Sequence, residues 1–216
     1  MVARVYGLKV DEIISVGKRG VSKTNMNEII PSIFEKWASE KLASYFQGFT
    51  YPKDAKGSYH ASMNPFLKTE EDIKMKFGAF LENELIPKGF TVHAEQTEIY
   101  KSSGRGYPPR PDLSVHEINR ADGVWISGSP NPVLTTLRAV IEIKYINYKY
   151  PNELFSNGHI EKDILKLKDL SLNVAKFALL LDEGGGISEK YIAATRELAK
   201  KVDVKILSNH KELKLC

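Results

Sequence analysis

The sequence contains a single cysteine, Cys216, at its last position. One cysteine cannot form a disulfide within the chain and cannot supply the several thiolates of a metal cluster. Disulfide-stapled secreted proteins and cysteine-ligated zinc proteins are therefore excluded as classes. We expect a protein of the reducing cytoplasm.

Long apolar runs are also missing. No stretch approaches the roughly 20 apolar residues that a membrane-spanning helix needs. The opening residues "MVARVYGLKVDEII" lack the continuous hydrophobic segment and small-residue cleavage site of a signal peptide. The 42% hydrophobic and 27% charged residues are ordinary for a globular protein. We expect no membrane association, and the net charge of +4 is compatible with nucleic acid without requiring it.

Several common catalytic motifs are absent. The five histidines show no H-E-x-x-H or other zinc spacing, and no G-x-S-x-G is present. The glycines of "DEGGGIS" lack the spacing of a phosphate-binding loop. These absences argue against a zinc hydrolase, covalent nucleophilic catalysis and a P-loop enzyme.

The patterns that are present predict an α/β protein. Residues 26–47 have helical apolar spacing, with Asn27 as the expected cap and Pro31 in the first turn, and residues 48–68 read as an irregular connection. We expect residues 1–68 to be an N-terminal helical and irregular extension of a single globular unit whose core is 69–216. In that core the expected order is a helix at 69–89 capped by Thr69, strands at 90–99, 110–118 and 138–146, a helix within 157–173, a strand at 176–183, a helix at 188–201 and a strand at 203–208. This order is typical of a mixed sheet covered by helices.

The most apolar of these strands contains two opposite charges. In "AVIEIKYI", residues 139–146, Glu142 and Lys144 point to one face of the strand while Ile141, Ile143 and Tyr145 point to the other. A buried carboxylate costs several kcal/mol unless it is paired or bound to a metal. The simplest interpretation of an isolated E-x-K is a structural ion pair or a strand end that reaches water.

The preceding strand favours a functional interpretation of these charges over a structural ion pair. Asp112 follows Pro111, which has no N–H and therefore belongs at a strand start or an irregular edge where the sheet can open. Two carboxylates from adjacent strands make a hard-oxygen site suited to Mg²⁺. Such an ion can deprotonate a water and neutralise charge on a phosphate, and Lys144 adds a further positive charge.

These residues resemble the motif of the PD-(D/E)XK nuclease superfamily: "PD" at Pro111 and Asp112, then "EIK" at Glu142, Ile143 and Lys144. The resemblance covers residues 69–207 and implies a restriction-endonuclease-like fold, a mixed β-sheet core flanked by helices. It implies that Asp112 and Glu142 bind Mg²⁺, or Mn²⁺ as a substitute, with help from the Ile143 carbonyl. Lys144 would orient or activate the attacking water.

Other charged residues are candidates around this site. Many members of the superfamily carry an acidic residue on the helix before the first strand, and a helical wheel favours Glu70 over Glu71. The alternative is a glutamate that serves only the helix dipole. Glu95 is expected at the rim. Asp163 and Lys166, on the helix after the motif strand, read as a solvated face and are left out of the predicted site.

The segment "KSSGRGYPPR", residues 101–110, ends directly before the PD motif. It brings Lys101, Arg105 and Arg110 near the predicted metal, where they could hold backbone phosphates of DNA. The alternative is a solvated hairpin without a ligand.

The sequence thus predicts a Mg²⁺-dependent DNA endonuclease. Cutting both strands of a duplex with one site per chain predicts a homodimer, with the N-terminal helical segment as its interface. One alternative is a nucleic-acid-binding or scaffold protein that keeps the nuclease fold without the chemistry, since fold does not guarantee function. Another is an ordinary α/β domain whose E-x-K is only an ion pair.

Overall fold

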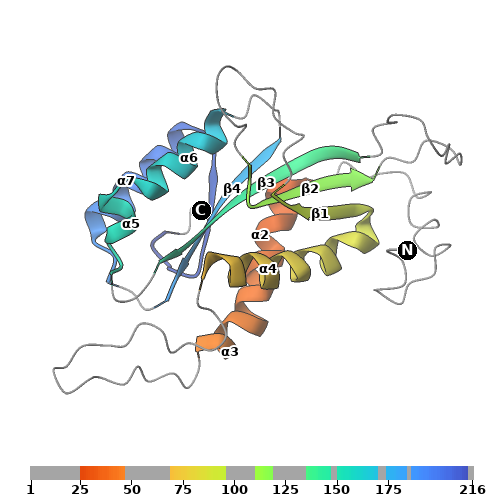
Figure 1. Ribbon diagram of the computed structural model, residues 1–216, viewed down its shortest axis with the longest axis horizontal. Helices are drawn as coiled ribbons and strands as arrows, with labels where there is room; N and C mark the ends of the chain where they lie inside the picture. Colours follow the sequence, from red (N-terminus) through yellow and green to blue (C-terminus); the bar gives the residue numbers. More distant parts are fainter. Residues whose placement is uncertain are drawn as a thin grey trace, which may run out of the picture.

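The computed structural model describes residues 25–46, 69–95, 110–118, 135–146, 150–169, 174–183 and 186–213. These residues form a five-stranded mixed sheet with helices on both faces (Figure 1). The helices are α2 (Met26–Trp37), α3 (Ala43–Phe46), α4 (Glu70–Leu85), α5 (Glu153–Ser156), α6 (His159–Asp169) and α7 (Glu189–Lys201). The strands are β1 (Phe90–Ala94), β2 (Leu113–Ile118), β3 (Thr135–Ile146), β4 (Ala175–Asp182) and β5 (Lys205–Ser208). The predicted α/β class is confirmed.

The strands lie in the sheet in the same order as in the chain, β1-β2-β3-β4-β5. β1, β2 and β3 pair antiparallel, whereas β3, β4 and β5 pair parallel. Parallel neighbours need a crossover connection, and α6 and α7 provide the two crossovers. Each predicted strand has its counterpart; β1 ends at Ala94, before a bend at Glu95, and residues 96–99 of the predicted strand lie outside the described residues. The short helix α5 was not predicted.

The start of α2 differs from the prediction. The cap is Asn25, whose side chain accepts a hydrogen bond from the Asn27 backbone N–H at 3.1 Å, so the prediction of Asn27 as cap is wrong. The physical reason is Met26, which is buried and therefore belongs inside the helix. The predicted single helix over 26–47 is also interrupted, because a π-helical stretch, Ala38–Leu42, separates α2 from α3.

Pro31 consequently lies inside α2, beyond the first turn. It has no N–H to donate to the carbonyl of Asn27, four residues earlier. Lys205 of β5 supplies the missing donor, because its Nζ lies 3.1 Å from that carbonyl oxygen. A side chain from the far end of the sequence thus satisfies a group that the proline leaves without a helical partner.

The start of α4 follows the prediction. The Thr69 side chain accepts from the Asp72 backbone N–H, and the Asp72 carboxylate accepts from the Thr69 backbone N–H, forming a capping box. Further along α4, Gly78 faces β2: a Cβ at this position would lie 3.2 Å from Leu113 Cδ2. The absent side chain therefore lets α4 pack closely against the residue that follows Asp112.

Two hydrophobic clusters fill the two sides of the sheet. On one side, α2 and α4 pack Phe34, Trp37 and Phe77 against alternate residues of β3 that include Ile141 and Ile143. On the other side, α6 and α7 cover a second cluster to which β3 contributes Val140 and Ile146. Since strand residues alternate faces, Glu142 and Lys144 lie on the face covered by α6 and α7. The helix α2, predicted as part of an extension, shares one cluster with α4 and the sheet.

In the part of the chain that the structure describes, no helix combines the length and apolar character needed to cross a membrane.

Candidate active site

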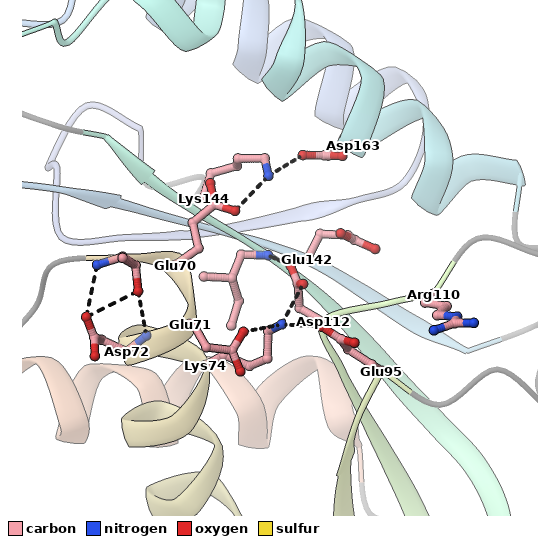
Figure 2. A network of polar contacts seen from close by, with 12 residues as sticks. Glu70, Glu71, Asp72, Lys74, Glu95, Arg110, Asp112, Glu142, Lys144 and Asp163 are labelled. Atoms are coloured by element: carbon pink, nitrogen blue, oxygen red, sulfur yellow. Dashed lines mark hydrogen bonds and ion pairs between the residues drawn. The ribbon is translucent and has the colours of Figure 1, made fainter.

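The candidate site lies where β2 and β3 part. β2 begins at Leu113, opposite Ile141, whereas β3 continues to Ile146. At this open edge the Asp112 side chain takes the place of a strand partner: its Oδ2 accepts a hydrogen bond from the Ile143 backbone N–H at 2.7 Å. The sheet therefore opens next to the proline-aspartate pair, and the two half-motifs meet there (Figure 2).

Glu142 is the buried acid of the site, with only 4% of its surface exposed. Its Oε1 lies 2.6 Å from Lys166 Nζ on α6. The separation defines an ion pair, but among the described residues this oxygen completes no well-directed hydrogen bond. Burial and, to a smaller extent, the negative charge of Asp112 raise the pKa of Glu142, Lys166 only partly offsets them, and the net value is about 8. Asp112 is thus close enough for its charge to act on Glu142.

Lys144 lies between two carboxylates. Its Nζ is 3.0 Å from Glu70 Oε2 at the start of α4 and 3.1 Å from Asp163 Oδ2 on α6 (Figure 2). Burial lowers the pKa of Lys144, but the two carboxylates outweigh it and the net shift is upward. Lys144 is therefore a fixed cation, suited to neutralising charge and not to accepting a proton.

Lys74 is a second buried cation beside the acids. It projects from α4 with 6% of its surface exposed, and its Nζ lies 2.8 Å from Glu71, 2.7 Å from Glu95 and 3.5 Å from Asp112. Burial lowers its pKa, but the hydrogen bonds to Glu71 and Glu95 and the charge of Asp112 outweigh this and raise it. Lys74 therefore holds Oδ1 of Asp112, while the Ile143 N–H holds Oδ2.

Glu95 adopts an unusual backbone conformation next to this lysine. Its φ of 49° lies in the left-handed region, which costs a non-glycine residue about 1 to 2 kcal/mol. Two contacts hold it there: its carboxylate binds Lys74, and its N–H donates to the Asp112 carbonyl at 3.3 Å. Glu95, which we expected at the rim of the site, is thus hydrogen-bonded directly to the backbone of Asp112.

The structure brings together Asp112, Glu142, Ile143, Lys144 and Glu70, all of which were singled out from the sequence. Arg110 is exposed, and Figure 2 shows its side chain apart from the network. The remaining predicted phosphate-binding residues, Lys101 and Arg105, lie outside the described residues.

Three residues that belong to the network were missed. The sequence reading assigned Asp163 and Lys166 to a solvated helix face, but both pair with the E-x-K residues of β3. Lys74 was overlooked, although a signal existed: it lies on the buried stripe of α4 with Phe77 and Leu81, at spacings of three and seven residues. A lysine inside an apolar helical stripe needs an acidic partner just as Glu142 needs a cation.

The oxygen atoms at the open edge match the preferences of a hard divalent cation. The Asp112 carboxylate accepts from the N–H of Ile143, the neighbour of Glu142, and its charge acts on the Glu142 carboxyl. The Ile143 carbonyl points to the same edge as its N–H, since both groups of a strand residue face one neighbour. Within the described ranges, no three Asp, Glu, His or Cys side chains are grouped to hold a metal. Asp112, Glu142 and the Ile143 carbonyl therefore fit Mg²⁺ as a partial set of ligands, which water and substrate oxygens would complete.

Comparisons with known proteins add no relative: no family model, no curated protein and no solved structure matches this chain.

Proposed function

We propose that this protein is a metal-dependent DNA endonuclease with a restriction-endonuclease-like fold of the PD-(D/E)XK type. The observation that carries the proposal is the meeting of Asp112, Glu142 and the Ile143 main chain at an open sheet edge, with Lys144 beside them. A structural ion pair explains one acid and one lysine. It does not by itself explain why two carboxylates from different segments lie together where the sheet opens, which is the arrangement that a divalent cation would use.

In this proposal Asp112, Glu142 and the Ile143 carbonyl would hold Mg²⁺, or Mn²⁺ in its place. When bound, the ion would supply charge neutralisation at the phosphate and a more acidic water. Lys144 remains protonated and stabilises the negative charge that builds up as a water attacks the phosphodiester in line. Glu70 and Asp163 position the Lys144 ammonium from opposite sides.

The oligomeric state follows from the substrate. A duplex presents two antiparallel strands related by two-fold symmetry, so one active site per chain would cut both strands as a homodimer. The N-terminal helical segment is the interface we propose. Light scattering of the purified protein, alone and with duplex DNA, tests this assignment.

The central experiment compares point variants on labelled linear and branched DNAs with Mg²⁺, Mn²⁺ or EDTA. Asp112→Asn, Glu142→Gln and Lys144→Met should each lower the cleavage rate at least about a hundredfold, because the first two weaken the proposed metal ligands and the third removes the cation that stabilises charge on the phosphate. Glu161→Gln and Lys162→Met are matched controls, since both residues are exposed on α6. We expect these controls to cut like the wild type and EDTA to abolish cleavage.

A wild-type protein that cuts none of the DNAs with any divalent cation would contradict the proposal. That result would favour a second candidate, a nucleic-acid-binding protein with a nuclease-like fold and no chemistry. One observation supports this candidate: each acid already has a lysine, Lys74 for Asp112 and Lys166 for Glu142. A binder of this kind should show salt-dependent DNA affinity that does not respond to divalent ions and leaves no product.

A further inference from the structure

Lys166 connects three parts of the candidate site. Its Nζ lies 2.6 Å from Glu142 Oε1 on β3 and donates to the Arg110 carbonyl oxygen at 2.7 Å, on the segment that leads into Asp112. Its side chain is 29% exposed, whereas Glu142 is almost fully buried. The ammonium therefore closes the solvent side of the buried acid.

A divalent cation and this ammonium would compete for the same carboxylate. Lys166 contacts Oε1 of Glu142 directly, so an ion bound to Glu142 would lie within a few ångströms of a positive charge. Two cations at such a separation repel each other more strongly in a partly buried site than in water, because the site screens their charges less. The charges are compatible only if the lysine moves away from Glu142 when the ion arrives.

We propose that Lys166 exchanges partners: it is the counter-ion of Glu142 in the metal-free protein, and it binds a backbone phosphate of the nucleic acid when a divalent cation replaces it. The inference rests on the proposed nuclease function. A released lysine at this position is partly exposed and stays tethered to α6 beside the acids, and an ammonium is a suitable point charge for a phosphate. Lys166 would thereby make metal binding and substrate binding mutually supportive.

Metal binding tests the first half of the exchange. Mn²⁺ affinity is measured by electron paramagnetic resonance without nucleic acid, at one fixed alkaline pH, for the wild type and three variants. Lys166→Gln should bind Mn²⁺ on the order of tenfold more tightly than the wild type, because the competing charge is gone. Lys166→Arg keeps the charge and Lys162→Gln removes an exposed charge from the same helix, so both should match the wild type.

Salt dependence tests the second half. Each phosphate contact adds about 0.9 to the slope of log affinity against log salt for duplex DNA. In Ca²⁺, on a duplex shown by electrophoresis to stay intact, Lys166→Gln should lower this slope by about 0.9 relative to the wild type. In EDTA, at the same alkaline pH as the Mn²⁺ measurement, the two slopes should be equal, since Lys166 is then held by the ionised Glu142. Lys162→Gln is the control: its salt slope should differ from that of the wild type by the same amount in Ca²⁺ as in EDTA.

The wild-type protein provides a measurement that does not depend on a variant folding. An amine-reactive label, quantified by mass spectrometry, should modify Lys166 several-fold faster after Mg²⁺ is added, while Lys162 is unaffected. Unchanged labelling, unchanged Mn²⁺ affinity in Lys166→Gln, or a slope difference that persists in EDTA would each overturn the exchange. If the wild type binds Mn²⁺ and cuts DNA while these tests fail, only this inference falls; if it binds no divalent ion at all, the proposed function falls with it.

Discussion

At the scale of single residues, the candidate site is built from alternating charges. Lys74 lies between Glu95 and Asp112, Lys166 beside Glu142, and Lys144 between two further acids. Removing ions from water costs more than a single ion pair returns unless the remaining oxygen atoms and protons also find partners. The network therefore fixes the geometry of the side chains at the expense of stability, which is the balance expected where a site serves binding or chemistry.

The burial of Glu142 should make the free energy of unfolding depend on pH. Its pKa is about 8 in the folded chain and 4.5 as the ordinary value. Between these values the folded chain keeps a proton that the unfolded chain has released, so the free energy of unfolding falls as pH rises from about 4.5 to 8. Glu142→Gln carries no such group. Above pH 8 it should exceed the wild type in stability by up to about 5 kcal/mol, since the two pKa values differ by about 3.5 and one pKa unit corresponds to about 1.4 kcal/mol.

Urea unfolding in EDTA, repeated from pH 5 to pH 9, checks this prediction. The difference between Glu142→Gln and the wild type should grow across the series. Stability curves that run parallel throughout would show that the Glu142 carboxylate is not buried against Asp112 as described.

His116 should have the opposite effect, at acidic pH. Burial lowers its pKa to about 4, with the charge of neighbouring His93 as a second cause. The unfolded chain takes up a proton below the ordinary value of 6.5 and the folded chain does not, so stability is lost as pH falls from 6.5 towards 4. His116→Gln should remove about 1 to 3 kcal/mol of this loss. Acid titration followed by circular dichroism measures it, with exposed His159→Gln as the control that should leave the acid midpoint unchanged.

At the scale of elements, short signals in the sequence determine where the site residues lie. Thr69 caps α4, and the next residue is Glu70, which reaches Lys144. Gly78, two turns later, lets the same helix approach Leu113, the neighbour of Asp112. The cap and the close packing together place the acidic start of α4 at the open edge of β3.

Thr69→Ala should cost about 1 kcal/mol of stability, because it leaves backbone N–H groups of the first turn without an acceptor. Thr69→Ser keeps the hydroxyl and should cost much less. Urea unfolding of the three proteins gives the comparison. An alanine variant as stable as the wild type would mean that the capping box does not hold the first turn of α4.

At the scale of the whole molecule, the two hydrophobic clusters share one sheet. β3 contributes Ile141 and Ile143 to the cluster under α2 and α4, and Val140 and Ile146 to the cluster under α6. Because both clusters pack on β3, displacing this strand would expose both of them to water. We therefore expect the described part of the chain to unfold as one cooperative unit.

Truncations on opposite sides of the sheet test this expectation. Phe77→Ala should cost about 3 to 5 kcal/mol and Ile164→Ala about 2 to 5 kcal/mol, through lost burial and the cavity left behind. In both variants tryptophan fluorescence and far-ultraviolet circular dichroism should report a single, coincident transition. Two separated transitions in either variant would mean that the clusters fold independently.

The sequence by itself determined the order of the strands and longer helices, the α/β class, the Thr69 cap and the choice of Asp112 and Glu142 as acids that lie near each other. Each of these depends on periodicity, capping chemistry or the cost of burying a charge, all of which are local and can be read along the chain. The sequence did not determine the start of α2, where two asparagines compete and the burial of Met26 decides. It also did not reveal the partners of the site.

Only the tertiary structure decided that Lys74, Asp163 and Lys166 belong to the network. On a helix wheel Asp163 and Lys166 look like a solvated face, and they become partners of Glu142 and Lys144 only because α6 packs over that side of β3. Whether a charge on a helix meets water or another charge depends on which strand lies beneath it. That choice is made by the packing of the whole sheet and by no single segment of the chain.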